Sequence, residues 1–281
     1  MLQSPCTYQG GKQRLAKQIV DIIELTVDDL YSKNYKFFDL CCGSGAVTLE
    51  LLNRGFNIKN VTMVDKGSWG KFWSSVGTGT FDVNKFKGYI SKIPLERAEI
   101  QGYLKRLASM DAKVDEEYVY LMLQAGAFGG KQIWRAGNKW CNATFRSFWQ
   151  PTETSNRRSV VNPMMPMPDE LYRRTEQIVH KCYGVNGLCT DVTDMVQQVT
   201  ETADNAIVYL DPPYSKTEGY GFMLDYINVI RMLQENNVKY IFVSEKEKLS
   251  MIAYQLAFSS AKGGISGMKK HNIEEWLNVY L

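Results

Sequence analysis

The chain has 281 residues, of which 44% are hydrophobic and 22% are charged, and this usage is ordinary for a folded globular protein. That composition excludes a disordered or fibrous chain, and the length suffices for one large core with or without a smaller appended domain. The net charge of +3 says little about partners. The apolar runs reach five or six residues, far below the roughly 20 that a membrane-spanning helix needs.

Cysteine and histidine usage narrows the possible chemistry. The six cysteines contain no C-x-x-C pair, so we expect free thiols in a reducing cytoplasm. The N-terminus shows no basic start followed by an apolar stretch, so we expect no secretory signal. The only two histidines, His180 and His271, are well separated, so we expect neither a metal site nor a histidine triad. These patterns predict a cytoplasmic protein without membrane or metal partners.

The N-terminal part of the chain alternates helix and strand patterns. Gln13–Ile23 is predicted to be helical, and the aromatic run Tyr35–Cys42 is typical of a buried parallel strand. Spacing then predicts a helix over Ala46–Asn53, a strand over Asn60–Asp65 and a short helix over Trp69–Val76.

The alternation of predicted helices and strands stops after about residue 80. Leu95–Met110 and Asp115–Ala127 are predicted helices. Two aromatic segments, Lys131–Trp134 and Trp140–Phe145, flank a polar turn, and this arrangement predicts a β-hairpin. Four of the eight prolines lie within residues 151–168, so we expect a stiff and irregular connection there.

After residue 178 the alternation resumes. Leu188–Thr190, Ala206–Leu210 and Tyr240–Ser244 are predicted strands, and Phe222–Glu235 is a predicted amphipathic helix. Trp276–Leu281 is expected to close the sheet.

The simplest architecture is α/β, with a doubly wound, Rossmann-like sheet interrupted by one insertion. Residues 1–79 and 179–281 would form the sheet. Residues 80–178 would form a mostly helical inserted domain that carries the hairpin. In such a sheet, ligands bind beyond the carboxyl ends of the strands, where the strand order reverses.

A glycine-rich turn, Asp39-Leu40-Cys41-Cys42-Gly43-Ser44-Gly45, follows the first predicted strand. Glycine lets a ligand approach the backbone because no Cβ stands in the way. The full G-x-G-x-x-G pattern is absent, which disfavours a pyrophosphate ligand. Asp65 ends the second strand, where a carboxylate commonly holds a pair of ribose hydroxyls; an ordinary turn residue would fit the pattern equally well.

A second motif, Asp211-Pro212-Pro213-Tyr214, directly follows an apolar strand. Two prolines fix φ twice and remove two N–H donors, so this corner is stiff and its carbonyls point in defined directions. A carboxylate before the corner and an aromatic ring after it indicate a site rather than a plain turn.

Together these motifs and their order resemble the Dam-type DNA adenine-N6 methyltransferase family. The segment Tyr8-Gln9-Gly10-Gly11-Lys12 resembles the W-x-G-G-K element of that family, Asp39–Gly45 its F-x-G-x-G region, Asp65 its second-strand acid and Asp211–Tyr214 its catalytic D-P-P-Y. Tyr8 replaces the usual tryptophan, and Leu40-Cys41 replace the usual Pro-Phe. The resemblance implies a methyltransferase sheet and a target-recognition domain in the insertion.

The resemblance also implies the reaction and its residues. A methyl group would pass from S-adenosylmethionine to the N6 amino group of an adenine flipped out of duplex DNA. The implied catalytic residues are Asp211, Pro212, Pro213 and Tyr214. The implied cofactor contacts are Tyr8, Gly10, Gly11, Lys12, Asp39, Cys41, Gly43, Ser44, Gly45, Asp65, Asp191 and Asp211.

The chemistry of the corner suits an amino nucleophile. The Asp211 carboxylate and the Pro212 carbonyl are suited to accept the two N–H bonds of the amine, and the carboxylate stabilises the positive charge that develops there. We expect an ordinary pKa of about 3.9 for Asp211 and a stacking role for Tyr214. Lys12 would either pair with the cofactor carboxylate or steady the corner. Asp191 would accept a bond from the cofactor's adenine.

Basic and aromatic residues concentrate between Lys131 and Arg158, with six basic residues, one acid and three of the six tryptophans. Basic side chains neutralise phosphates, and a hairpin can enter the major groove. The predicted DNA contacts are Lys131, Arg135, Asn138, Lys139 and Arg146. The alternative is a small aromatic core with solvated charges around it.

Other functions remain open at this point. An amino methyltransferase could act on DNA cytosine-N4, RNA adenine or a protein glutamine, although those relatives more often carry Ser or Asn before the Pro-Pro. A catalytically silent DNA-binding subunit would not need an intact Asp211–Tyr214 and Lys12. The resemblance implies a cytoplasmic enzyme of a bacterial or phage-infected cell, acting as a monomer or as a dimer on DNA.

Overall fold

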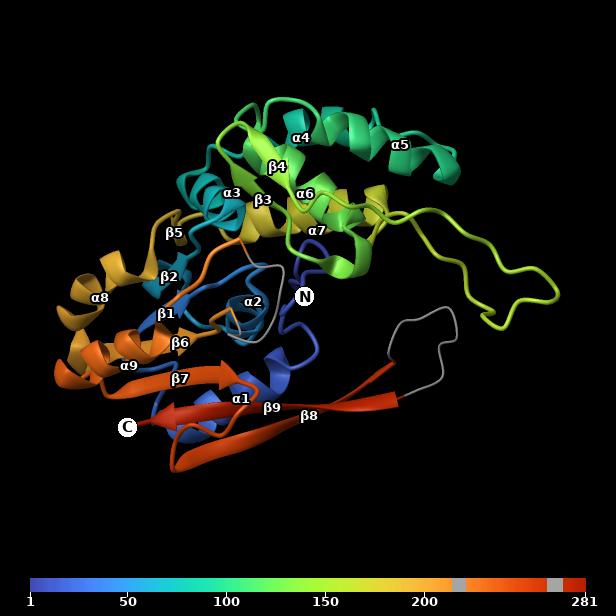
Figure 1. Ribbon diagram of the computed structural model, residues 1–281. Helices are drawn as coiled ribbons and strands as arrows, with labels where there is room; N and C mark the ends of the chain where they lie inside the picture. Colours follow the sequence, from blue (N-terminus) through green and yellow to red (C-terminus); the bar gives the residue numbers. More distant parts are fainter. Residues whose placement is uncertain (214–220, 262–269) are drawn as a thin grey trace.

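A seven-stranded sheet forms the centre of the computed structural model, which describes residues 1–213, 221–261 and 270–281. The strands are β1 (Lys36–Leu40), β2 (Val61–Val64), β5 (Asn186–Leu188), β6 (Ala206–Leu210), β7 (Tyr240–Glu245), β8 (Ile252–Ala261) and β9 (Lys270–Tyr280). Their order is β5-β2-β1-β6-β7-β9-β8 (Figure 1). The first five run parallel, whereas β9 runs antiparallel to both β7 and β8. This mostly parallel α/β sheet is consistent with a Rossmann-like methyltransferase fold.

Helices occur in both sheet-forming parts of the chain and in the insertion between them. They are α1 (Ala16–Thr26), α2 (Ala46–Asn53), α3 (Ser68–Thr78), α4 (Val83–Ile90), α5 (Arg97–Ala108), α6 (Glu116–Gly126), α7 (Pro168–Lys181), α8 (Val192–Thr200) and α9 (Tyr226–Glu235). Short 3-10 turns lie at Ile58–Asn60, Phe128–Gly130 and Ala203–Asn205. No helix among these described residues has the length and apolarity to cross a membrane.

The central strand β6 is apolar at every position because it is covered on both faces. Side chains alternate along a strand, so Ile207 and Tyr209 enter a core with α1, α2 and α3, while Val208 and Leu210 enter a second core with α8 and α9. Every residue of β6 is buried. The continuous apolar run therefore reflects burial from two sides.

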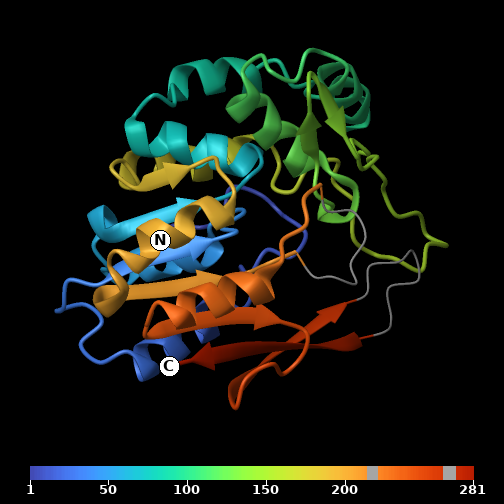
Figure 2. The ribbon, with the colours of Figure 1, turned by 60° about the vertical axis from the view of Figure 1, so that its left-hand side comes forward.

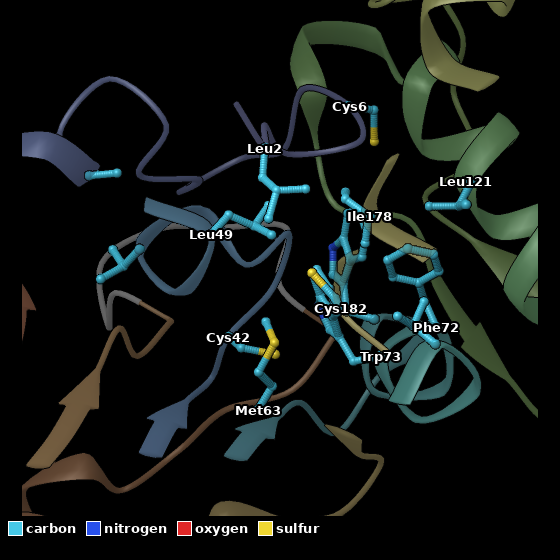
Figure 3. Close-up of a cluster of buried hydrophobic side chains, with 14 of the residues drawn as sticks. Leu2, Cys6, Cys42, Leu49, Met63, Phe72, Trp73, Leu121, Ile178 and Cys182 are labelled. Carbon is cyan, nitrogen blue, oxygen red and sulfur yellow. The ribbon is translucent and has the colours of Figure 1, made fainter. Parts of the chain in front are cut away.

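The helical insertion shares the first of these cores with the sheet. Helices α4 to α7 and the hairpin strands β3 (Trp134–Ala136) and β4 (Lys139–Cys141) lie on the side of the sheet where β5 is the edge strand (Figure 2). Figure 3 shows Leu49 of α2, Met63 of β2 and Phe72 of α3 on the sheet side of this cluster. Leu121 of α6 and Ile178 of α7 belong to the same cluster. Apolar packing is thus continuous from the sheet into the insertion.

An irregular arm lies between the hairpin and α7. Backbone hydrogen bonds in both directions between Trp149 and Val161 (3.1 and 2.9 Å) close its base. Residues 150–160 have no helix or strand, as the proline-rich sequence predicted, and both ribbon views show the arm projecting from the body (Figures 1 and 2).

Most of the predicted elements are confirmed, and two match at both ends. These are the helix Ala46–Asn53 and the strand Ala206–Leu210. The first helix begins at Ala16 rather than Gln13, and α9 begins at Tyr226 rather than Phe222, because the Asp225 side chain caps it by accepting from Asn228 N. The hairpin strands lie closer to their turn than predicted.

One predicted position in the sheet is wrong. The C-terminal strand does not close the sheet, because β9 pairs with β7 on one side and with β8 on the other, and β8 is the edge. The prediction missed β8, α4, α7 and α8. Helix α7 escaped detection because nine of its 14 residues are polar or charged in a sequence that follows a proline-rich segment.

The packing of α3 against β5 yields a stability prediction. A Cβ added to Gly187 would lie 2.2 Å from the carbonyl carbon and oxygen of Trp73, so helix and strand approach at backbone distance. Gly187→Ala should lower the free energy of unfolding by about 1–3 kcal/mol in urea denaturation. Gly88→Ala in α4 is the control, since a Cβ there meets nothing within 4 Å and should add about 0.5–1 kcal/mol. Equal effects of the two variants would contradict the packing.

Candidate functional site

The two predicted motifs meet at the carboxyl end of the sheet. β1 lies between β2 and β6, so the strand order reverses beside it. The Asp211 N–H donates to the Leu40 carbonyl (3.3 Å) and the Asp65 N–H donates to the Leu188 carbonyl (3.2 Å). A pocket of about 860 Å³, its open mouth included, lies against these strand ends.

Nearly all of the predicted cofactor residues line this pocket. They are Tyr8, Gly10, Gly11, Lys12, Asp39, Cys41, Gly43, Ser44, Asp65, Asp191 and Asp211. Pro212 and Pro213 line it as well, whereas Tyr214 lies outside the described residues. Gly45 is the one predicted cofactor residue that does not line the pocket. Its Cα faces the core, where an added Cβ would lie 2.4 Å from the Trp73 ring.

The glycine turn is shaped by its neighbours. Cys41, Gly43 and Gly45 all have positive φ, at 67°, 48° and 73°. The Trp73 indole Nε1–H donates to the Gly43 carbonyl (2.9 Å), and a Cβ on Gly43 would lie 2.9 Å from the Tyr8 ring. The turn therefore holds the left-handed backbone that glycine favours, and it brings main chain rather than side chain to the pocket.

Two acids, the buried Asp39 and the half-buried Asp65, lie beside this turn. Asp39 Oδ2 accepts from the Thr48 hydroxyl (2.6 Å), while Oδ1 is buried without a hydrogen-bond partner in the described chain. Burial raises the pKa of Asp39 to about 7. Asp65 accepts from the N–H groups of Gly67 (2.7 Å) and Gly43 (3.2 Å), and burial raises its pKa to about 6. Both oxygens of Asp65 thus fasten the turn at the second strand to the turn at the first.

A buried ion cluster fastens the D-P-P corner. Lys12 Nζ lies 2.6 Å from Asp211 Oδ1, 2.9 Å from Glu275 Oε1 and 2.8 Å from the Gly10 carbonyl oxygen. Lys12 is 4% exposed. Of the two predicted roles for Lys12, the structure supports steadying of the corner. The expectation of an ordinary pKa for Asp211 is wrong, because burial raises that pKa to about 7, although Lys12 opposes the rise.

Asp191 sits in the pocket wall with both carboxylate oxygens engaged. Oδ2 pairs with Lys66 Nζ (2.6 Å), and Oδ1 caps α8 by accepting from the N–H (3.0 Å) and hydroxyl (2.9 Å) of Thr193. The hydrogen bond from Lys66 holds the pKa of Asp191 below its usual value. These bonds leave Asp191 less suited to receive an adenine amino group than the sequence alone indicated.

Several pocket residues were missed by the sequence reasoning. Phe222 and Leu224 add apolar wall, and Gln132, which precedes the hairpin, accepts from the Gly221 N–H through Oε1 (3.1 Å). Glu275 was missed as well. The local sequence gives no signal for it, because Glu275 follows Glu274 in a strand that also contains Lys270 and Asn278.

The predicted DNA contacts separate into two groups. Lys131, Asn138 and Lys139 are exposed. Arg135 instead pairs with Glu116 (2.8 Å) and donates to the Gly137 carbonyl (2.7 Å). Arg146 is largely buried, burial lowers its pKa, and its Nη1 has no hydrogen-bond partner in the described residues. The structure therefore does not bring Arg146 to the hairpin tip, because its chain segment packs under α6 through the Arg146 N–H bond to the Gly126 carbonyl (3.0 Å).

Comparison with protein families identifies the N-terminal motifs. Residues 8–66 match the family model of D12 class N6 adenine-specific DNA methyltransferases. This match supports the predicted family. The match covers the Tyr8–Lys12 element, the glycine turn and Asp65; the D-P-P corner lies beyond it. Members of this family are adenine-specific DNA methyltransferases and hence enzymes. No curated protein matches the chain.

No group of three or more His, Cys, Asp or Glu side chains among the described residues is arranged to hold a metal ion.

The buried acids predict a pH dependence of stability. The pKa of Asp39 is higher in the folded chain than the unfolded value of about 3.9, so between pH 4 and 7 the folded state binds more protons and its stability falls as the pH rises. Asp39→Asn should remove part of that fall and gain on the order of 2 kcal/mol relative to the native chain at pH 8 compared with pH 5. Urea denaturation at both pH values measures this difference. The exposed Asp204→Asn is the control, and an Asp39→Asn variant with the native pH dependence would contradict the prediction.

Proposed function

We propose that the chain transfers a methyl group from S-adenosylmethionine to the N6 amino group of adenine in a short sequence of duplex DNA. The observation that carries the proposal is the meeting of the D-P-P corner and the glycine turn in one pocket, with the Lys12 ammonium holding Asp211 in place. The D12 class match at residues 8–66 supports the choice of adenine and DNA.

The residues of the pocket fit S-adenosylmethionine. Asp39, Asp65 and Asp211 place three carboxylates around the cavity, and this charge suits a ligand that carries a sulfonium and an ammonium. The partnerless Oδ1 of Asp39 is a buried acceptor at the same wall. Phe222 and Leu224 offer an apolar surface for a purine. Asp65 would hold the ribose hydroxyls and the glycine turn would face the amino-acid part.

When bound, S-adenosylmethionine supplies a methyl group activated by its positively charged sulfur. Asp211 uses Oδ1 for Lys12, so Oδ2 is the oxygen we assign to an N–H of the target amine. The Pro212 carbonyl takes the second N–H, and the two bonds turn the nitrogen lone pair out of the ring plane. As the amine gains positive charge, the ionised Asp211 stabilises it in a site with little water, where a fixed charge acts strongly. Catalysis of this kind depends on alignment and electrostatics.

The insertion, residues 80–178, is proposed as the target-recognition domain. Lys131, Asn138 and Lys139 stand exposed on and beside the hairpin, where they could reach phosphates and base edges. Arg135 would act indirectly, since its bond to Glu116 ties the hairpin to α6. Tyr214 is proposed to stack on the flipped base. Its DNA substrate would place the enzyme in the cytoplasm of a bacterial or phage-infected cell.

Removal of the catalytic carboxylate tests the reaction. Asp211→Ala should reduce methyl transfer to duplex DNA by on the order of 10³-fold or more, because the charge that stabilises the developing ammonium is gone. Binding of S-adenosylmethionine should remain measurable by calorimetry, since Lys12 keeps Glu275 as its ion-pair partner. The exposed Asp204→Ala, before the amino end of β6, is the matched control and should keep native activity.

The same assay decides between functions. Labelled S-adenosylmethionine is supplied with duplex DNA, RNA or protein, and the products are digested and identified. N6-methyladenine from DNA supports the proposal. Label on cytosine, RNA or protein would reassign the substrate, and full activity of Asp211→Ala would refute the assigned mechanism. A chain that binds DNA but transfers no label would be a silent subunit.

The hairpin predicts a salt-dependent DNA affinity. Lys139→Ala should weaken binding and reduce the slope of log affinity against log salt concentration by about 1, because one phosphate contact is lost. Lys59→Ala provides the same charge change before the amino end of β2, whereas the pocket lies at the carboxyl ends of the strands, and it should leave the slope unchanged. Fluorescence anisotropy with a duplex probe at several salt concentrations measures both. If both variants keep the native slope, the hairpin tip does not contact DNA.

A further inference from the structure

Lys12 serves two carboxylates from different parts of the chain. Asp211 follows β6, in the parallel part of the sheet, and Glu275 lies within the antiparallel strand β9. The side chain of Lys12 is 4% exposed, that of Glu275 7% and that of Asp211 18%. An ammonium has three N–H bonds, and the three oxygen atoms within 3 Å of Lys12 Nζ match that number. The ammonium is thus held by geometry between the two acids.

We propose that Glu275 is a positioning residue of the catalytic centre, which shares Lys12 with Asp211 and so prevents the ammonium from neutralising the catalytic carboxylate. The inference rests on the proposed function of Asp211 and deepens it. Glu275 does not touch the target base in this scheme. It acts through Lys12, by limiting how strongly the ammonium stabilises the ionised Asp211, so that this carboxylate interacts more strongly with a cationic amine.

The electrostatic reason lies in the balance of charges. A buried one-to-one pair of lysine and aspartate would be neutral, and its carboxylate would be a poor stabiliser of a cationic amine. With Glu275 added, two carboxylates compete for the Lys12 ammonium, so Asp211 receives only part of its positive charge. Bringing a second carboxylate into this desolvated place is costly to the fold, so its presence beside Asp211 points to a role other than stability.

Other groups around Asp211 either raise its pKa, as Glu275 does, or carry no charge. Glu245, at the end of β7, also raises the pKa of Asp211, and Asp39 on β1 is a further buried acid of the pocket. Tyr209, two residues before Asp211, has its hydroxyl hydrogen-bonded to Ser244 (2.8 Å) and adds no charge at neutral pH. Lys12 opposes the rise in the pKa of Asp211, whereas Glu275 reinforces that rise.

A purely structural role for an acidic or amide side chain in β9 looks different. Asn278, three residues further on, is fully buried and binds the segment after β7: its Oδ1 accepts from Leu249 N (2.6 Å) and its Nδ2 donates to the Glu247 carbonyl (3.1 Å). Those bonds are to backbone and fasten a loop. Glu275 instead forms an ion pair with Lys12, which also binds Asp211.

The test is a direct titration of Asp211. The full chain is labelled with ¹³C at aspartate carboxyls, the Asp211 signal is assigned by its loss in Asp211→Asn, and its chemical shift is followed against pH. Glu275→Gln keeps size and a carbonyl oxygen for Lys12 but removes one negative charge. We expect the pKa of Asp211 to fall by about one unit in this variant. In methyl-transfer assays, the acid limb of kcat/KM should move to lower pH by the same amount while the maximal rate decreases.

Glu235→Gln at the exposed end of α9 is the control for loss of one acidic charge and should change neither titration nor rate. The proposal is overturned if Glu275→Gln leaves the Asp211 titration unchanged or moves it upward, even where the melting temperature falls. Should Glu275→Gln not fold, Glu275→Asp, which retains the charge but withdraws it by one methylene, is expected to keep the acid limb and lose rate; native kcat in that variant would also overturn the proposal. The titration needs no activity, so a native chain that fails to methylate DNA would remove the proposed function without deciding the electrostatic result.

Discussion

The site depends on keeping Asp211 charged in a largely buried place, where water solvates it poorly. Burial alone raises the pKa of that carboxyl group, and the Lys12 ammonium opposes the rise from 2.6 Å away. Lys12 precedes helix α1, Asp211 directly follows strand β6, and Glu275 lies in the last strand, β9. One ion cluster therefore joins the beginning, the middle and the end of the sequence, and the sheet has to be complete before the catalytic corner exists.

Sequence reasoning located the chemistry better than the electrostatics. Periodicity and strand-end motifs found both halves of the sheet, and the stiffness of two prolines was enough to mark the corner. The sequence could not show that Lys12 is shared between Asp211 and Glu275, because Glu275 on β9 lies 64 residues beyond Asp211 and is brought close only by the strand order. For the same reason the terminal strand was placed at the edge, although it pairs on both sides.

The charged residues of the insertion were the hardest to interpret. Arg135 and Lys139 look alike in a basic, aromatic stretch, yet one pairs with a buried glutamate and the other is exposed. Arg146 was predicted to contact DNA, whereas the fold directs its guanidinium inward. Net charge along a segment predicts its partner only where the side chains point outward, and orientation is set by packing that the local sequence does not encode.

The continuity of the apolar core from sheet to insertion has a mechanical consequence. Where two domains meet only through a thin and polar contact, they can swing apart and close again around a ligand. Here Trp73 and Phe72 stand between the glycine turn and the helices of the insertion, all in one cluster (Figure 3). The hairpin tip is therefore held at a fixed distance from Asp211. Under the proposed function, the DNA rather than the protein would have to deform to bring a base to Asp211.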